Sequence, residues 1–569
     1  MDILIKNGIV FDPLNKIDGE VMDIAIRDGR IVDESELSGD VYIMDASNKI
    51  VMAGAIDIHS HIAGPKVSTG RLLMPQDHYL SNIPHRLPYR RSQTGIAVPN
   101  VFKIGYTYAE MGYTFVVEPA TPPLKTRHTH EELNDIPIID KLALLLVDSN
   151  WMALDYIVNN DYDRLAAYIA WLLYSTKTYS IKLVDPGSDV AWMYGGESLD
   201  LDMEIPKYGL TPKDIILAFD KVCNLLNLPH KIHLHGNRLG YPGNYTTTVN
   251  TLKLASKMVS KGISLHMTHV QFTGYSGDSW YNLGSGAEDI ARIINQLRNI
   301  SIDIGQVIPG YTAITMTADA PFEYLLYHIT KWKWCFADVE SETASGIVPY
   351  RYRWKNYVNT IQWVIGLEVL LLTNDLWRVY LTTDHPNAGP FISYPKVISW
   401  LMSKKAREDV MARMNRRAIS KSILPSINRE LTFYDIAIIT RAAPAKLLGL
   451  DHERGHLGVG AIADIAIYDL NPREIDPSKD YKTIERAFRK SLYTIKNGVI
   501  VVKNGEVIST TYGRTYYVNP MVSEDITRDI IGDLKSKFKS YYSISLDNYI
   551  IDGCELRDSK QIDVTTKLA

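Results

Sequence analysis

The sequence has few cysteines and no strong excess of charge of either sign. Its three cysteines, at positions 223, 335 and 554, form neither a CxxC pair nor a disulfide framework. Dispersed thiols of this kind are typical of a reducing compartment, and three are too few to hold a four-cysteine iron–sulfur cluster. The 61 basic and 65 acidic residues give a net charge of −4, so there is no reason to expect nucleic acid or an anionic membrane as a partner.

The sequence also lacks a long hydrophobic run. Its most apolar internal stretch, VIGLEVLLL, is short and carries Glu368, so it predicts a buried helix rather than a membrane span. The first residues, MDILIKNGIVFDP, contain no basic region followed by an apolar core, and no secretory leader is expected. We therefore expect a cytoplasmic protein.

At 569 residues the chain is too long for one simple core, and two similar β-rich segments lie near its ends. Residues 1–52 contain short strand patterns with Asn-Gly and Asp-Gly hairpin signals. A similar pattern of short strands and turn residues occurs near the other end, in ADIAIYDL and LYTIKNGVIVVKNGEVIST, and the sequence IKNG occurs in both segments. We expect residues 1–52 and 432–515 to form one composite β-sandwich domain, followed by a C-terminal extension at 516–569.

Between these segments, strands alternate with longer amphipathic stretches. The strand candidates include AIDIHSH, YTFVVEPA, SIKLVDPG, KIHLHGN, SLHMTHVQF, ISIDIGQV and RVYLTTDHP. This alternation predicts an α/β protein with a parallel sheet, and the length of residues 53–431 suits a (β/α)8 barrel with insertions. A doubly wound open sheet is the alternative, but no glycine-rich phosphate loop follows any of the strands.

Histidines gather at the ends of the predicted strands. Seven of the 15 lie there: His59, His61, His233, His235, His266, His269 and His385. In a parallel barrel these ends form the face that carries the chemistry. Alternation along a strand puts His59 and His61 on the same side, so that their imidazoles can converge on one metal ion.

The later histidine pairs leave alternatives open. His233 and His235 share a face, and we prefer His235 as a ligand because the Gly-Asn turn that contains Asn237 follows it directly. His266 and His269 are three residues apart and are expected to face opposite ways. We prefer His269, nearer the strand end, with His266 as a buried structural histidine.

Lys182, in SIKLVDPG, has apolar neighbours on its strand. A strand lysine that reaches solvent is the commoner case. A lysine held among apolar side chains, however, loses its proton more easily. The neutral amine can take up carbon dioxide and become a carbamate able to bridge two metal ions, although spacing alone does not establish this.

Asp384 and His385 stand at the end of the last strand, in VYLTTDHPNAGP. A turn alone would explain an Asp here. With imidazoles arriving from other strands, Asp384 becomes a candidate metal ligand that also carries a proton to or from a reacting nitrogen, and His385 a supporting or substrate-side candidate. Such nitrogen and oxygen donors suit zinc, and also iron or manganese, and two metals would polarise a carbonyl.

Together these residues resemble the amidohydrolase superfamily. The phrases HSHIAGPKV, MGYTFVVEPATPPLKTRHTHEEL, IDIGQVIPG, TMTADAPFEYLLY, SGIVPYRYR and TTDHPNAGPF resemble the A subunits of formylmethanofuran dehydrogenases. The resemblance implies a metal-dependent (β/α)8 barrel, a β-sandwich built from both termini, and a dinuclear zinc site with a carboxylated lysine. Carried over residue by residue, the implied ligands are His59, His61, Lys182, His235, His269 and Asp384. The other candidates, His233, His266, His385 and Asn237, would support the ligands or face the substrate.

The resemblance also implies the reaction and the partners. Such a complex reduces carbon dioxide to formate at a tungsten or molybdenum pterin, and the pterin and iron–sulfur groups lie on other subunits. The A subunits then condense formate reversibly with the primary amine of methanofuran, with Asp384 taking the proton of the amine. The alternatives are a cyclic amidase resembling hydantoinase or dihydroorotase, and a non-catalytic scaffold.

Two further segments are expected near the site. RHTHEE, at 127–132, is predicted to start a helix or to support the site. The long loop 62–100 is expected to help cover the site, with a solvated basic loop as the alternative. Its polar residues are Asp77, His78, Arg86, Arg90 and Arg91.

Overall fold

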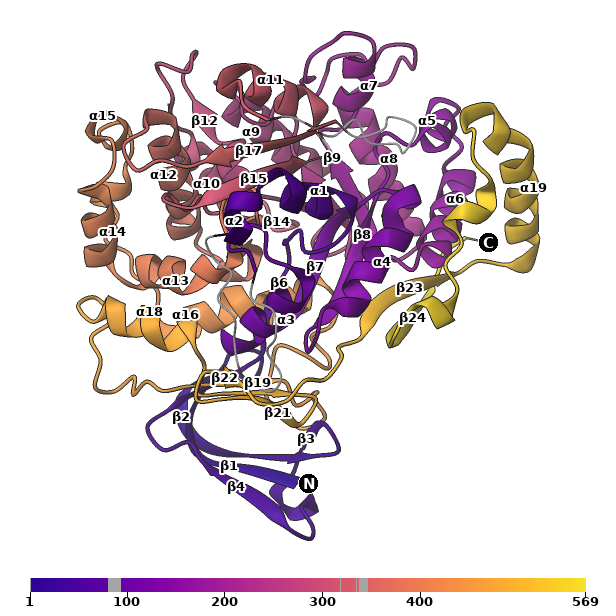
Figure 1. Cartoon of the computed structure of the whole chain (residues 1–569). Helices are drawn as coiled ribbons and strands as arrows, with labels where there is room; N and C mark the ends of the chain where they lie inside the picture. The colour runs from indigo at the N-terminus through magenta and orange to yellow at the C-terminus, as the bar shows by residue number, and fades with distance from the viewer. Residues whose placement is uncertain (1, 80–93, 318, 334, 337–345, 569) are drawn as a thin grey trace.

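The computed structural model describes residues 2–79, 94–317, 319–333, 335–336 and 346–568 (Figure 1). The central sheet contains ten strands in the described residues, and eight of them follow one another in chain order: β6 (Ala55–Asp57), β7 (Tyr113–Thr121), β8 (Asp140–Leu146), β9 (Ser180–Val184), β10 (Ile232–His235), β11 (Leu265–Met267), β14 (Ile300–Asp303) and β18 (Val379–Tyr380). Each strand pairs in parallel with the next. The predicted α/β barrel is confirmed.

The first and last strands meet just beyond their ends. Ser60 and His385 form a parallel bridge, and the His61 N–H donates to the His385 carbonyl over 2.7 Å. This contact joins the β6 and β18 sides of the curled sheet. The segments that carry His61 and His385 are therefore held side by side at the C-terminal face of the barrel.

Helices cover the outside of the sheet, so the strands are apolar on both faces. β8, for example, is buried along its whole length. The principal covering helices are α3 (Val101–Glu110), α4 (Thr126–Asp135), α6 (Tyr162–Ser175), α8 (Pro212–Leu225), α10 (Ala287–Gln296) and α12 (Tyr357–Leu372). α8 begins at a capping box between Thr211 and Asp214, with Pro212 as its first residue.

The apolar stretch VIGLEVLLL lies within α12, where Glu368 is buried and accepts the N–H groups of Ile423 and Leu424. The prediction of a buried helix is confirmed. Among the residues that the structure describes, no helix is both long enough and apolar enough to span a membrane.

A second, mixed sheet contains strands from both ends of the chain. Its strands are β1 (Asp2–Asp12), β2 (Ile17–Arg27), β3 (Arg30–Val32), β4 (Val41–Asp45), β5 (Ile50–Ala53), β19 (Ile465–Tyr468), β20 (Tyr493–Lys496), β21 (Val499–Lys503) and β22 (Glu506–Val507). β5 and β19 pair antiparallel, and side chains from both ends share one apolar cluster. The domain boundaries at residues 52, 432 and 515 stay predictions.

The last part of the chain adds to the barrel sheet. β23 (Thr515–Met521) pairs in parallel with the start of β8, and β24 (Ser559–Thr565) pairs with β23. Between them, α19 (Glu524–Tyr541) contacts α6 on the outside of the barrel, as the yellow segment in Figure 1 shows. The described part of the C-terminal extension, residues 516–568, therefore packs against the barrel.

Two short helices follow β6 at the C-terminal face: α1 (Pro65–Leu73) and α2 (Pro75–Tyr79). Glu132 of α4 holds α1 in place, because its carboxylate accepts the Gly64 N–H, the Ser68 hydroxyl and the Arg71 guanidinium, each over 2.7 Å. RHTHEE thus lies in a helix, as predicted. Of the residues named in loop 62–100, Arg86, Arg90 and Arg91 lie outside the described residues.

Candidate metal centre

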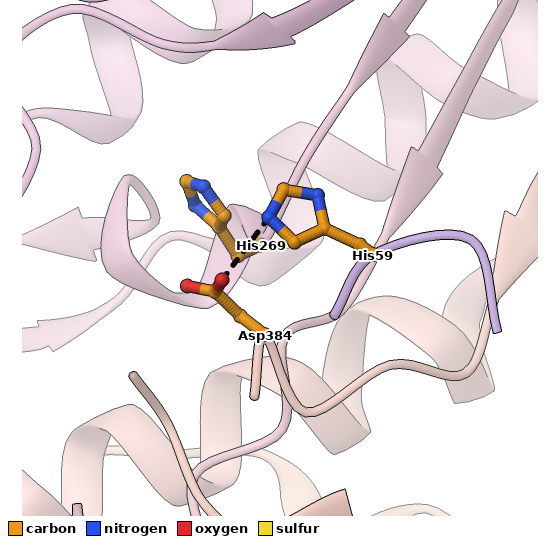
Figure 2. Close-up of side chains that lie close together, drawn as sticks. All are labelled: His59, His269 and Asp384. Atoms are coloured by element: carbon orange, nitrogen blue, oxygen red, sulfur yellow. Dashed lines mark ion pairs between the residues drawn. The ribbon is translucent and has the colours of Figure 1, made fainter. Parts of the chain in front are cut away.

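The strand ends bring His59, His269 and Asp384 together from three separate parts of the chain (Figure 2). The Nε2 atom of His59 lies 3.0 Å from Oδ1 of Asp384. One donor atom from each of the three residues lies within 4.8 Å of the other two, and all three residues are buried. This spacing allows the three side chains to hold one metal ion.

His61 approaches the same oxygen of Asp384 as His59 does. Its Nε2 atom is 3.5 Å from Oδ1 of Asp384, and its Nδ1 atom is 3.1 Å from Oε1 of Glu118 on β7. The second oxygen of Glu118 accepts the N–H groups of Ile62 and Ala63. Glu118 therefore orients both the imidazole of His61 and the chain that follows it.

Lys182 projects from β9, with His233 of β10 as its partner in the strand register. The Nζ atom is buried and has no hydrogen-bond partner among the described residues. Burial lowers the pKa of Lys182 to about 7, although the nearby carboxylates of Asp384 and Asp303 favour the charged form. A substantial fraction of the amine is therefore neutral near pH 7 and able to react with carbon dioxide.

His235 ends β10 beside His269, with their ring centroids 4.6 Å apart. Its Nε2 atom lies 3.2 Å from Oδ2 of Asp319, the residue that caps α11 (Ala320–Thr330). The structure thus places His235 next to the group of His59, His269 and Asp384.

His233 and His266 lie one layer deeper in the barrel. The Nε2 atom of His233 is 2.9 Å from Nδ1 of His59, and the Nε2 atom of His266 is 3.1 Å from Oδ2 of Asp303. Asp303 also lies 3.8 Å from Nδ1 of His59. These contacts occupy the rear nitrogen of His59 and leave its Nε2 atom facing Asp384, as supporting residues do around metal ligands.

The expectation that His266 and His269 face opposite ways is wrong. β11 ends at Met267, and His269 has a φ of 35°, so strict alternation stops before it. Both side chains reach the barrel interior, at different depths. Gly305 makes room for this turn, because a Cβ atom on it would lie 2.3 Å from Cβ of His269.

His385 and Asn237 have other contacts. The His385 ring packs edge-on against Phe391 at a centroid distance of 4.8 Å. The side-chain amide of Asn237 donates to the Pro186 carbonyl over 3.1 Å and so links the loops after β9 and β10. Neither side chain belongs to the groups of residues close enough to share a metal ion in the described part of the chain.

Three acidic residues of the site were not predicted from the sequence: Glu118, Asp303 and Asp319. Glu118 and Asp303 stand in the strand candidates YTFVVEPA and ISIDIGQV. Both stand near the end of a predicted strand, and the criterion that selected the histidines would therefore have selected these two acids as well. Asp319 precedes a helix, and its contact with His235 has no comparable signal in the sequence.

The donors in this centre fit a divalent metal ion. Burial, followed by the positive charge of neighbouring groups, lowers the pKa well below the usual value in four histidines: His59, His233, His235 and His269. Neutral imidazoles are the form that binds metal. Within the described part of the chain, neutral His59, His235 and His269, the buried carboxylate of Asp384 and the unpaired amine of Lys182 form a set of donors that a divalent cation would satisfy, while His233 supports His59.

The chain matches the model of the amidohydrolase family over residues 42–502. It belongs to this family. The amidohydrolase is 46% identical over 556 residues to Protein FwdA of Methanocaldococcus jannaschii, with 96% of each chain covered. It is 36% identical over 518 residues to the A subunit of the formyltransferase/hydrolase complex Fhc of Methylorubrum extorquens, with 90% of each chain covered.

A solved structure is similar over the full length of the amidohydrolase. It is the crystal structure of FhcABCD from Methylorubrum extorquens in complex with methylofuran, with a TM-score of 0.89 and 32% identity. The match covers 99% of this chain and 100% of the solved one. The resemblance to the A subunits of formylmethanofuran dehydrogenases is confirmed, and the protein is a metal-dependent amidohydrolase.

Proposed function

We propose that this amidohydrolase condenses formate with the primary amine of methanofuran to give formylmethanofuran and water, and hydrolyses formylmethanofuran in reverse. The observation that carries the proposal is the similarity to Protein FwdA over 96% of both chains. The crystal structure of the similar Fhc complex contains methylofuran, which supports a substrate of this class. The protein would act in the cytoplasm within a formylmethanofuran dehydrogenase complex, whose other subunits hold the tungsten or molybdenum pterin and the iron–sulfur clusters.

The proposed site holds two divalent metal ions, with zinc as the preferred metal. Its proposed ligands are His59, His61, Lys182, His235, His269 and Asp384. The amine of Lys182 is buried and has no hydrogen-bond partner among the described residues, which is unfavourable for a polar group. Conversion to a carbamate would remove this cost, because the carbamate oxygens would bind the metal ions. When bound, the two metals polarise the carbonyl of formate or of the formyl group and lower the pKa of a water molecule.

Asp384 is the proposed acid–base group. Its Oδ1 atom already contacts His59, His61 and the Asn387 side-chain amide, which leaves Oδ2 as the atom that exchanges a proton. In condensation, this oxygen takes a proton from the attacking amine nitrogen. In hydrolysis, it returns the proton to the nitrogen as the carbon–nitrogen bond breaks.

The barrel interior excludes bulk water from these groups. Asp384 is 2% exposed and His59 is 1% exposed. Exclusion of water favours amide formation, because hydrolysis of the product competes with its synthesis.

The alternative functions remain a cyclic amidase and a scaffold subunit. The full-length similarity to Protein FwdA and to the A subunit of the Fhc complex favours the formyl reaction over ring opening. The gathering of four buried histidines and Asp384 at one face favours an enzyme over a scaffold.

The experiment that tests the function measures metal content and formylmethanofuran hydrolysis together, in the wild type and in Lys182→Ala. We expect two metals per chain and activity in the wild type, and loss of both in the variant. Lys231→Met is the control, because Lys231 precedes β10 at the opposite end of the barrel and donates to the Leu228 carbonyl.

Three results would contradict the proposal. Full activity with both metals in Lys182→Ala would exclude the carbamate-bridged site. A wild-type protein that opens a hydantoin or dihydropyrimidine ring but leaves formylmethanofuran intact would favour the cyclic amidase. Less than one metal per chain in carefully prepared protein would favour the scaffold.

A further inference from the structure

The amine of Lys66 is buried near the metal centre and has no hydrogen-bond partner among the described residues. Lys66 is the second residue of α1, in the segment that follows His61. The residue as a whole is partly exposed, but its Nζ atom is covered. An ammonium group has three donors, and leaving them unsatisfied inside a protein costs free energy unless a ligand accepts them.

Four carboxylates act on the Lys66 amine through their negative charge, but in the described part of the chain none of them accepts a hydrogen bond from it. The negative charges of Glu118, Asp189, Asp148 and Glu323 all favour the protonated amine. Glu118 is already engaged by His61 and two backbone N–H groups, and Asp148 by the Val184 N–H and the Ser149 hydroxyl. These two acids therefore favour the charged ammonium without accepting its hydrogen bonds, and its N–H groups stay available to a ligand.

Burial lowers the pKa of Lys66 to about 8, with the four carboxylates opposing the shift. The amine thus keeps its proton at neutral pH.

The positive charge of the Lys66 amine acts on two of the proposed ligands, Lys182 and His235, and lowers the pKa of each. The helix of Lys66 is held firmly, because Val67 packs into an apolar cluster and Glu132 binds the first turn. Gly64 permits this close packing, since it has a φ of 99° and a Cβ atom on it would lie 2.7 Å from Oγ1 of Thr129.

We propose that Lys66 is a substrate-binding residue whose ammonium donates hydrogen bonds to an oxygen of formate, or to the formyl oxygen in the reverse reaction. This proposal rests on the proposed function. Formate is a small carboxylate, and a hydrogen bond between an ammonium and a carboxylate is strengthened by both charges. Lys66 supplies a positive charge that offsets the negative charges of nearby carboxylates, which would otherwise repel the anion.

The first test measures formate binding to the metal-loaded protein by isothermal titration calorimetry. We expect Lys66→Met to bind formate at least about 10-fold more weakly than the wild type, and Lys66→Arg to bind it with an intermediate affinity. Metal content should be unchanged in both variants. Lys125→Met is the control, because Lys125 ends a short helix beside α4 and belongs to no part of the centre.

The second test separates binding from chemistry. In the condensation direction, Lys66→Met should raise KM for formate by about 10-fold while KM for the amine stays unchanged. A merely structural role would alter both substrates or the metal content. Unchanged formate affinity in Lys66→Met, or loss of its metals, would overturn the assignment.

The two proposals can fail separately. If the wild type binds formate through Lys66 but does not hydrolyse formylmethanofuran, the proposed function fails and the anion site stands. If the wild type is active and Lys66→Met binds formate normally, the function stands and the role of Lys66 is refuted.

Discussion

The Nε2 atom of His59 lies 3.0 Å from the Oδ1 atom of Asp384, although the two residues follow the first and the last strand of the barrel. Ser60 and His385, their immediate neighbours in the chain, form a parallel bridge just beyond the ends of these two strands. The pair therefore exists only when the two sides of the sheet have met. A centre built across this junction couples metal binding to the completed fold.

Asp384→Asn should lower kcat for formylmethanofuran hydrolysis by about 100-fold or more. The amide keeps an oxygen donor and nearly the same shape, but it cannot take up the proton. Steady-state kinetics with metal content determined on the same sample would measure this. Asp375→Asn is the matched control, since Asp375 caps a short helix and pairs with Arg378. An Asp384→Asn enzyme with normal kcat would refute the acid–base role.

His233→Ala should weaken metal binding by about 10- to 100-fold, because His59 loses the group that occupies its Nδ1 atom. Competition with a metal-binding dye would give the affinities. His130→Ala is the control, because His130 is also buried but belongs to another part of the barrel. Its Nε2 atom hydrogen-bonds to the Thr176 carbonyl over 3.0 Å. Equal metal affinities in the two variants would show that His233 does not support the centre.

Removal of metal with a chelator should lower the Tm and abolish activity, and zinc should restore both. Metal that binds the folded chain more tightly than the unfolded chain stabilises the folded state by mass action. Differential scanning calorimetry before chelation, after it and after reconstitution would measure the effect. An unchanged Tm after complete metal loss would contradict a centre coupled to the fold.

A buried ionic network joins the barrel to the composite sheet. Asp140 of β8 pairs with Arg454 and Lys496, and the Nζ atom of Lys496 lies 2.7 Å from Oδ2 of Asp140. Burial raises the pKa of Asp140, but the two cations outweigh it and lower the pKa to about 2. The ionised carboxylate therefore stabilises the folded state at pH values above its unfolded pKa of about 4, and this contribution is lost as the pH falls through the folded pKa.

Asp140→Asn should therefore lower the free energy of unfolding by about 3 kcal/mol at pH 6, because it leaves buried cations less compensated. The difference from the wild type should shrink as the pH falls towards 2. Urea unfolding at several pH values would measure it. A difference that stays constant with pH would show that Asp140 carries no depressed pKa.

Much of this architecture follows from local sequence patterns. Alternating strands and helices predicted the barrel, because each strand buried on both faces must be apolar and each crossover needs a helix. Alternation within β10 predicted that His233 and His235 share a face, and both point into the barrel. The apolar neighbours of Lys182 indicated a buried amine, and its Nζ atom is buried.

The depth and pairing of the side chains were decided only by the tertiary structure. Sequence spacing did not show that His233 contacts His59 while His235 lies beside Asp319, because strand register and barrel closure determine these contacts. The direction of His269 depends on a positive φ, and Gly305, in the loop after β14, leaves the space that this turn needs. Residue types and periodicity thus determined which face carries the chemistry, and long-range packing determined which atoms meet there.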